Sequence, residues 1–240
     1  MAKAVRHRSK DGDRVPDPEE PVQSRFTAGE ITRKCDAAIA TATSLLDEIA
    51  VLAPEHRTID NTLLRFEQVT AEYQDRVLPL TIMGYVYPDP AIAAEGVACE
   101  EKTGAFTIGI YSRRDLYNAI RDQVPRNPGE QRLLTMTLRD FVRNGLALPD
   151  DQLAQVREMK TRLSRLEIQF SSNLNNDSTT LEFSADELAG VPATALATFS
   201  RTGTGTFLVT TKYPDYYAIM QNADRSDTRR RMASAFNNRQ

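Results

Sequence analysis

The sequence predicts a mainly α-helical protein with one small β element. Apolar residues recur at steps of three and four over most of the chain, which is typical of helices that bury one face. Residues suited to helix caps, together with prolines and glycines, mark where those helices begin and end. The pattern alternates instead near residues 179–211, where we expect a two-stranded element.

The first 25 residues lack the apolar pattern and are predicted to form a disordered leader. Basic side chains gather in residues 1–10 and acidic ones in residues 11–20, and prolines interrupt residues 16–21. Few apolar side chains are available to offset the cost of ordering the chain. We therefore expect three parts: a solvated leader at 1–25, a helical bundle at 26–177, and strands with further helices at 178–240.

Regular structure is expected to begin at Thr27, which can cap a helix together with Glu30. This helix ends before Pro54, and a second one runs from Asp60 to about Pro79. The apolar faces of these two helices are Ile31, Cys35, Ala38, Ala42, Leu45, Ile49 and Leu52, then Leu63, Phe66, Val69, Tyr73 and Val77.

Proline at the first helical position predicts two more helix starts, at Asp89-Pro90 and at Asn127-Pro128. The helix from Asp89 is expected to continue to Ile120. Three glycines inside it lower its helix propensity and point to a closely packed neighbour: Gly96, Gly104 and Gly109. The helix from Asn127 is expected to stop at Gly145, since glycine suits the left-handed position after a helix end.

The most regular element follows Pro149 and extends to about Asn176. Its apolar residues are spaced three, four, three and four, as in a heptad seam that packs against another helix. They are Val156, Met159, Leu163, Leu166 and Phe170. At 1.5 Å per residue, this helix is roughly 42 Å long.

Beyond Asp177 the chain changes character. Residues 179–183 and 206–211 read as strands, with Gly203 and Gly205 in the turn before the second strand. Between them, Ser184 and Glu187 form a second capping box and Gly190 a second helix stop. Two helices, 216–223 and 226–236, are expected to close the chain.

Composition excludes several classes of protein. A formal net charge of -3 gives no field that favours nucleic acid, and single-strand binding has no support because tryptophan and a basic aromatic surface are both lacking. No stretch reaches the roughly 20 apolar residues of a membrane span, and the first residues lack the apolar core of a secretory signal. Cys35 and Cys99 are expected to be buried free thiols rather than a bridge, in a reducing cytoplasm.

A search for catalytic groups finds no constellation. The histidines are His7 and His56, and neither begins the H-E-x-x-H pattern that places two imidazoles on one helix face for zinc. Cys35 and Cys99 have no histidine nearby. Gly203 and Gly205 suit a strand turn better than a phosphate loop, because no Lys-Ser or Lys-Thr pair follows them.

The remaining polar groups also have structural interpretations. The carboxylate pairs at 100–101 and 150–151 suit helix surfaces and helix starts. The arginines at 229–231 fan around a helix instead of forming one clamp, and Tyr216 and Tyr217 suit a core or its rim better than a peptide groove. No catalytic, cofactor-binding or metal-binding residue is assigned in this chain.

Six segments in order nevertheless resemble one family. They are Arg57-Thr-Ile-Asp-Asn-Thr-Leu64; Leu138-Arg-Asp-Phe-Val-Arg-Asn-Gly-Leu-Ala-Leu-Pro149; Leu166-Glu-Ile-Gln-Phe-Ser-Ser-Asn-Leu-Asn175; Leu188-Ala-Gly-Val-Pro192; Lys212-Tyr-Pro-Asp-Tyr216; and Thr228-Arg-Arg-Arg-Met232 with Ala235-Phe-Asn-Asn-Arg239. The first is similar to the R-T-F-x-N-T-L segment, and the second to the D-F-x-R-x-G-x-x-L-P run, of the thimet oligopeptidase and neurolysin family of zinc metallopeptidases.

This resemblance covers roughly residues 25–240 and implies the N-terminal part of such an enzyme, a helical wall of a channel that admits short peptides. In the family, zinc and a catalytic glutamate act from a later H-E-x-x-H helix, which this sequence does not include. The resemblance therefore implies zinc in the complete enzyme, none held here, and an inactive chain. Because the helical pattern continues to Gln240 without a stop signal, we expect a fragment or a split-gene product whose partner is the missing C-terminal catalytic half.

Two hypotheses follow. In the first, the chain is the channel-wall portion of a cytoplasmic zinc oligopeptidase and exposes a large apolar surface where the catalytic half docks. In the second, it is a stand-alone helical scaffold that binds peptides or a partner protein without catalysis, and its surface is well sealed. An H-E-x-x-H reading frame directly after codon 240 would favour the first hypothesis.

Overall fold

The computed structural model describes residues 23–239, so the predicted leader lies almost entirely outside the described residues. The chain divides into two compact units, and the long helix α7 passes through the point of division. Unit 1 comprises the described residues through Ile168, and unit 2 begins at Gln169. Both units are mainly helical and the strands lie in unit 2, so the predicted fold class is confirmed.

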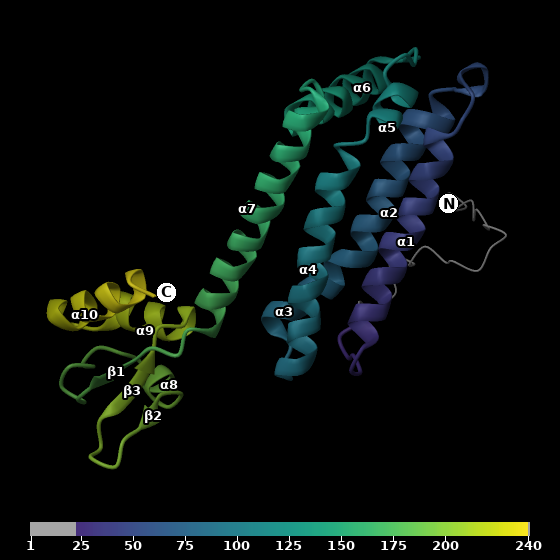
Figure 1. Ribbon diagram of the computed structural model, residues 1–240. Helices are drawn as coiled ribbons and strands as arrows, with labels where there is room; N and C mark the ends of the chain where they lie inside the picture. The colour runs from purple at the N-terminus through teal and green to yellow at the C-terminus, as the bar shows by residue number, and fades with distance from the viewer. Residues whose placement is uncertain (1–22, 240) are drawn as a thin grey trace, which may run out of the picture. The chain divides into compact units, whose positions relative to one another are not determined.

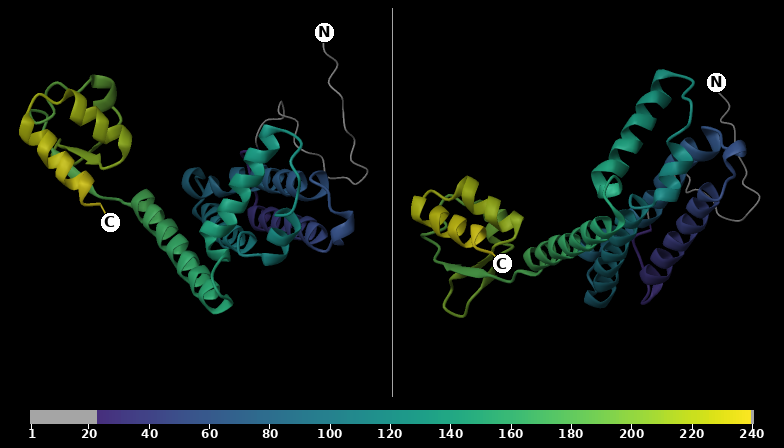
Figure 2. Two further views of the ribbon diagram at one scale, coloured as in Figure 1. Left: turned by 90° about the horizontal axis from the view of Figure 1, so that it is seen from above. Right: turned by 45° about the horizontal axis from the view of Figure 1, so that its top comes forward.

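Unit 1 contains seven α-helices among the described residues, with α7 continuing past its end (Figure 1). The bounds are α1 Glu30–Ala50, α2 Arg65–Thr81, α3 Met83–Val86, α4 Pro90–Ile110, α5 Arg114–Ile120, α6 Pro128–Phe141 and α7 Asp150–Asn176. Two π-helical turns, Asp60–Leu64 and Val142–Leu146, precede α2 and follow α6. In both Figure 1 and Figure 2, α1, α2 and α4 run side by side.

The main cluster of buried residues lies among α1, α2, α5 and α6. Every apolar residue predicted for the second helix, from Leu63 to Val77, is buried in it. On α1, Leu46 is fully buried where the periodicity pointed to Leu45, which is partly buried against the same cluster. Around Phe141, the rings of Phe66, Tyr111 and Tyr117 stand at centroid distances of 5.3–5.8 Å.

The predicted helix from residue 89 to residue 120 is interrupted. Three residues, 111–113, separate α4 from α5, and Arg113 takes an extended backbone with ψ of 106°. Its guanidinium forms ion pairs with Asp47 at 2.5 Å and with Asp115 at 2.7 Å. These ion pairs hold Arg113 in place between the two helices. Its extended backbone lets α5 start in a new direction, so the pairs favour the break.

Two of the three predicted close approaches at glycines are present. A Cβ on Gly96 would lie 2.3 Å from the backbone N of Gly84, so α3 and α4 touch through bare backbone. A Cβ on Gly104 would lie 2.7 Å from Ser164 Oγ, where α7 passes α4. A Cβ on Gly109 would meet no atom within 4 Å, so no packing contact requires glycine at that position.

A second buried cluster, the α1–α4 cluster, joins the first half of α1 to α3 and α4. It consists of Phe26, Ile31, Cys35, Leu80, Met83, Ile92 and Cys99. Within it Cys35 and Cys99 form a disulfide with Cα atoms 5.9 Å apart, so the expectation of free thiols is wrong. Residues 64 apart on different helices meet because each cysteine sits on the inward face of its own helix, a pairing that local periodicity does not specify.

Unit 2 is built on a three-stranded antiparallel sheet of order β1-β3-β2. The strands are β1 Thr180–Phe183, β2 Ser200–Arg201 and β3 Phe207–Thr210, so the predicted pair is present and a short third strand adds to it. Phe183 pairs with Phe207, and Leu181 pairs with Val209. The helices are α8 Ala193–Leu196, α9 Tyr213–Asn222 and α10 Ser226–Asn237, and α9 and α10 lie over one face of the sheet (Figures 1 and 2).

The segment after β1 differs from its prediction. Ser184 and Glu187 make the reciprocal bonds of a capping box: Ser184 N donates to Glu187 Oε2 at 2.8 Å, and Glu187 N donates to Ser184 Oγ at 3.3 Å. Residues 185–190 form turns instead of the expected helix, and they end at Gly190, which takes a φ of +92° and lies against the carbonyl of Asn222. The capping box here stabilises a turn that packs onto the end of α9.

Replacing Gly96 by alanine is expected to destabilise the protein by about 1–3 kcal/mol, because the added methyl overlaps backbone atoms of Gly84 that cannot rotate away. Gly109→Ala on the same helix is the matched control and is expected to be neutral or up to about 1 kcal/mol more stable. Urea unfolding followed by circular dichroism measures both. Equal stability of the two variants would show that α3 and α4 do not approach this closely.

Candidate functional site

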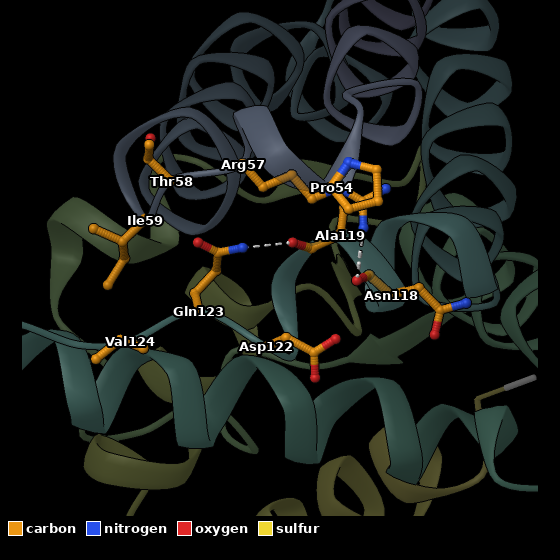
Figure 3. Close-up of a pocket in the computed structure, with 9 residues that line it drawn as sticks. All are labelled: Pro54, Arg57, Thr58, Ile59, Asn118, Ala119, Asp122, Gln123 and Val124. Atoms are coloured by element: carbon orange, nitrogen blue, oxygen red, sulfur yellow. Dashed lines mark hydrogen bonds between the residues drawn. The ribbon is translucent and has the colours of Figure 1, made fainter.

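One surface hollow, of about 350 Å³, lies where the connection after α1 meets the end of α5 (Figure 3). Its walls come from residues 54–59 and 118–124. The first wall leads into the Arg57–Leu64 segment that carries the family resemblance. The lining residues are Pro54, Arg57, Thr58, Ile59, Asn118, Ala119, Asp122, Gln123 and Val124.

Arg57 connects the two walls. Its Nε donates to the carbonyl of Leu52 at 2.9 Å, and its Nη1 donates to the carbonyl of Asn118 at 3.2 Å. Figure 3 shows the guanidinium between the two segments. A guanidinium presents donors in a fixed planar fork, so one side chain can hold the connection against α5.

Thr58 and Asn61 form the start of the helix that follows. Thr58 N donates to Asn61 Oδ1 at 2.8 Å and Asn61 N donates to Thr58 Oγ1 at 3.3 Å, an exchange like that of a capping box. Asn61 Nδ2 also donates to the carbonyl of His56 at 2.9 Å. The polar residues of this family-like segment therefore satisfy backbone groups at a helix start.

The hollow contains no pair of groups suited to acid–base or nucleophilic catalysis. Asp122 is paired with Arg121 at 3.3 Å, and the amide of Gln123 donates to the carbonyl of Ala119 at 3.0 Å. The hollow offers carbonyls, an amide and a few apolar atoms, which suit binding rather than bond cleavage.

A second surface feature is an apolar stripe along α7. Its members are the large side chains of the predicted heptad seam: Met159, Leu163, Leu166 and Phe170 are exposed by 61%, 55%, 57% and 61%. On a different face of the helix, Leu153 and Ile168 are buried. The helix predicted at 149–176 is confirmed, and most of its seam is open to solvent.

The histidines and cysteines behave differently from one another. His56 is exposed in a short 3-10 turn, Pro54–His56, and His7 lies outside the described residues. Cys35 and Cys99 are bonded to each other in the disulfide and offer no free thiol. Across residues 23–239, no group of three or more histidine, cysteine or acidic side chains is placed to hold a metal ion.

The arginines at 229–231 separate as predicted. Arg229 donates to the carbonyl of Asp224 at 3.0 Å, Arg230 pairs with Asp227 at 2.7 Å, and Arg231 pairs with Glu187 and lies over the ring of Phe183. Each has its own structural partner, so they form no common anion site.

The two predicted rim tyrosines form part of a larger aromatic group. Tyr216 stacks on Phe236 at a centroid distance of 3.9 Å, and Tyr217 lies 5.9 Å from Tyr213. Tyr217 is exposed by 48%, while Tyr216 is half-buried. Gly203 and Gly205 lie in the turn between β2 and β3, which confirms their interpretation as a strand turn.

The acidic pairs are structural as well. Glu100 accepts a hydrogen bond from Tyr85 Oη, and Asp150 pairs with Arg114 at 3.0 Å at the start of α7. Burial, followed by the hydrogen bond and charge of Glu100, raises the pKa of Tyr85 to about 12. The phenol therefore remains a hydrogen-bond donor to this carboxylate at neutral pH.

The sequence did not predict that residues 118–124 line a surface hollow. The sequence signal was present only in part: Arg57 stands in a recognisable segment, while Asn118 contributes a backbone carbonyl, a group every residue type carries. Because the acceptor is a backbone group, the identity of residue 118 could not indicate this contact.

Arg57→Ala is expected to lower the free energy of unfolding by about 1–3 kcal/mol, because two backbone carbonyls lose a charged donor. Arg57→Lys should recover part of the loss, since an ammonium reaches one carbonyl. Arg165→Ala, at an exposed position of α7, is the control and should change little. An Arg57→Ala variant as stable as the control would show that the connection is held by other contacts.

Residues 23–239 include no helix with both the length and the apolar character that a bilayer crossing requires. No protein-family model matches the chain.

Similarity to known proteins is extensive but distant. The chain is 26% identical over 212 residues to a thimet-like oligopeptidase from Dictyostelium discoideum, covering 84% of this chain and 32% of that protein. It is 24% identical over 238 residues to saccharolysin from Saccharomyces cerevisiae, covering 92% of this chain and 33% of that protein. It is 25% identical over 151 residues to a probable cytosolic oligopeptidase A from Arabidopsis thaliana, covering 55% of this chain and 22% of that protein.

The chain thus spans about a third or less of the length of the relatives it matches. Most of its own length takes part in these matches, as the six family-like segments led us to expect. The resemblance of this chain to the thimet oligopeptidase family is confirmed.

Proposed function

We propose that this chain is the N-terminal, substrate-channel portion of a zinc-dependent oligopeptidase that hydrolyses short peptides. The similarity to oligopeptidases over 84% and 92% of the chain carries this proposal. Because those relatives are about three times longer, the portion represented here would work together with a further catalytic portion.

The apolar stripe on α7 supports a docking role. Four large apolar side chains, each more than half exposed, follow one another along about three helical turns. Burying a leucine contributes about 1.5–3 kcal/mol, so a surface of this kind favours a protein partner strongly. We propose that its occupant is the catalytic portion, whose polypeptide accounts for the remaining length of the relatives.

The metal would be held by that other portion. Zinc sites need three or four nitrogen, sulfur or oxygen ligands in tetrahedral reach, and residues 23–239 present no such cluster. The disulfide also removes the two thiols as ligands. In the complete enzyme a bound zinc would polarise the scissile carbonyl and activate water, while this portion would guide peptides toward it.

We also propose that the enzyme acts in the cytoplasm. The name of one relative, a probable cytosolic oligopeptidase A, supports this location.

The isolated chain is expected to hold no stoichiometric zinc and to leave a fluorogenic short peptide intact, because residues 23–239 present no set of zinc ligands. Metal analysis after dialysis and a cleavage assay with and without chelator measure this. One tightly held zinc per chain, or chelator-sensitive cleavage by protein free of contaminating protease, would contradict the proposal.

Docking is tested with the catalytic portion encoded after codon 240, recognised by its H-E-x-x-H motif and produced as a separate polypeptide. Leu163→Glu with Leu166→Glu is expected to weaken binding by at least about tenfold, since two charges would replace exposed leucines that the docked partner would cover. Val51→Glu is the matched control: Val51 is 81% exposed, lies off α7, and its replacement should leave binding unchanged.

Isothermal titration calorimetry measures the affinity of both variants. Equal binding by the double variant and the control would remove the stripe as the docking surface. If a stop codon follows with no such reading frame nearby, the stand-alone peptide- or protein-binding scaffold becomes the better explanation.

A further inference from the structure

The disulfide between Cys35 and Cys99 is buried inside unit 1. It connects α1 to α4 inside the α1–α4 cluster, and both cysteines are buried, with 0% and 1% exposure. Its buried residues differ from those of the main cluster, although Ile39 on α1 packs against both clusters. The bond therefore affects one end of unit 1 directly.

Noncovalent contacts also hold the start of α1 and the segment before it against α4 and the end of α3. Tyr87 Oη accepts from the backbone N of Phe26 at 3.0 Å and donates to the carbonyl of Phe26 at 2.9 Å. Glu95 on α4 accepts from the backbone N of Gly29 at 2.6 Å and of Thr32 at 3.2 Å, at the start of α1. These contacts would bring the two cysteine side chains back together whenever the reduced cluster closes.

The charge of Glu95 further stabilises the contact between α4 and the start of α1. The hydrogen bond from Gly29, followed by those from Thr32, holds the pKa of Glu95 below its ordinary value, against the effect of desolvation. The carboxylate is thus ionised at neutral pH and its charge lies against the N-terminus of α1, where a helix dipole favours it. Geometry and charge together favour the closed arrangement of α1 on α4, so the reduced cysteines would meet again each time the cluster closes.

We propose that Cys35 and Cys99 form a reversible redox couple that clamps α1 to α4 when oxidised and releases that end of unit 1 locally when reduced. This proposal does not depend on the peptidase role of the chain. Its basis is the coincidence of a buried bond, a small cluster at one end of unit 1, and noncovalent contacts that favour reclosure of this cluster after it opens.

The co-reactant belongs to the class of low-molecular-weight disulfides, such as glutathione disulfide. One thiolate attacks glutathione disulfide, forming a mixed disulfide and releasing one glutathione thiolate, which takes up a proton. The second cysteine thiolate then attacks the protein sulfur of the mixed disulfide and releases the second glutathione. Two thiols are oxidised, one glutathione disulfide is reduced to two glutathione molecules, and the reverse sequence restores the thiols.

Burial sets the route by which this exchange occurs. A sulfur with no exposed surface reacts only when the α1–α4 cluster opens, and local openings of this kind need far less free energy than global unfolding. Once the mixed disulfide has formed, the second cysteine is held nearby at high effective concentration. The mixed disulfide should therefore not accumulate in the natural chain.

The redox state is measured on the full chain in buffers of varied glutathione to glutathione disulfide ratio, with denaturing alkylation and mass spectrometry. We expect a single reversible transition in which both cysteines or neither are alkylated. Cys99→Ser should instead accumulate the glutathione adduct of Cys35, since it lacks the second thiol. Thiols that stay reduced in excess glutathione disulfide, or a bond reduced only under conditions that unfold the whole chain, would overturn the proposal.

The local nature of the clamp is measured by native-state hydrogen exchange. Reduction should speed exchange by about tenfold or more in the first half of α1, in α3 and in the first half of α4, and should leave α5 and α6 unchanged. Cys35→Ser with Cys99→Ser should resemble the reduced natural chain and be insensitive to glutathione. If that variant does not fold, the natural chain kept in excess reductant supplies the comparison, and a uniform change over all of unit 1 would refute a local clamp.

Discussion

Burial of one continuous face of α1 is the constraint on which unit 1 depends. Its first half, with Ile31 and Cys35, belongs to the α1–α4 cluster, and its second half, with Leu46 and Ile49, belongs to the main cluster. Between them the buried residues of α1 are alanines, which are small enough for neighbouring helices to approach closely. Fully burying each large aliphatic residue contributes about 1.5–3 kcal/mol, so α1 ties both clusters of the unit together.

The sequence predicted what a single helix determines by itself. Which residues face inward is a property of spacing along one element, and the buried positions Phe66, Val69 and Tyr73 follow from it. Which element covers that face depends on residues far away in the sequence, so the periodicity of α1 could not indicate a partner for Cys35. The break at residues 111–113 was missed for the same reason, because it is favoured by an ion pair between Arg113 and the distant Asp47.

The family-like segments carry structural information more than chemistry. Arg57 holds a connection against the carbonyl of Asn118, and Asn61 caps a helix start. Gly145 takes a φ of +101°, and a Cβ there would lie 3.3 Å from side chains of Leu153 and Val156, so glycine permits both the turn and the packing of α7. Residues of this kind shape the backbone, so these parts of the resemblance rest on residues that serve folding.

The helix α7 has one face packed against unit 1 and another apolar face exposed to solvent. On one face it is fitted to unit 1, with Leu153 in the main cluster and Ser164 against the bare backbone of Gly104. On another it presents apolar side chains at heptad spacing, centred on Leu163 and Leu166, to solvent. A helix that served only to fill unit 1 would carry polar residues on that second face. The packing of unit 1 does not account for the apolar stripe, which is why we propose the stripe as a docking surface.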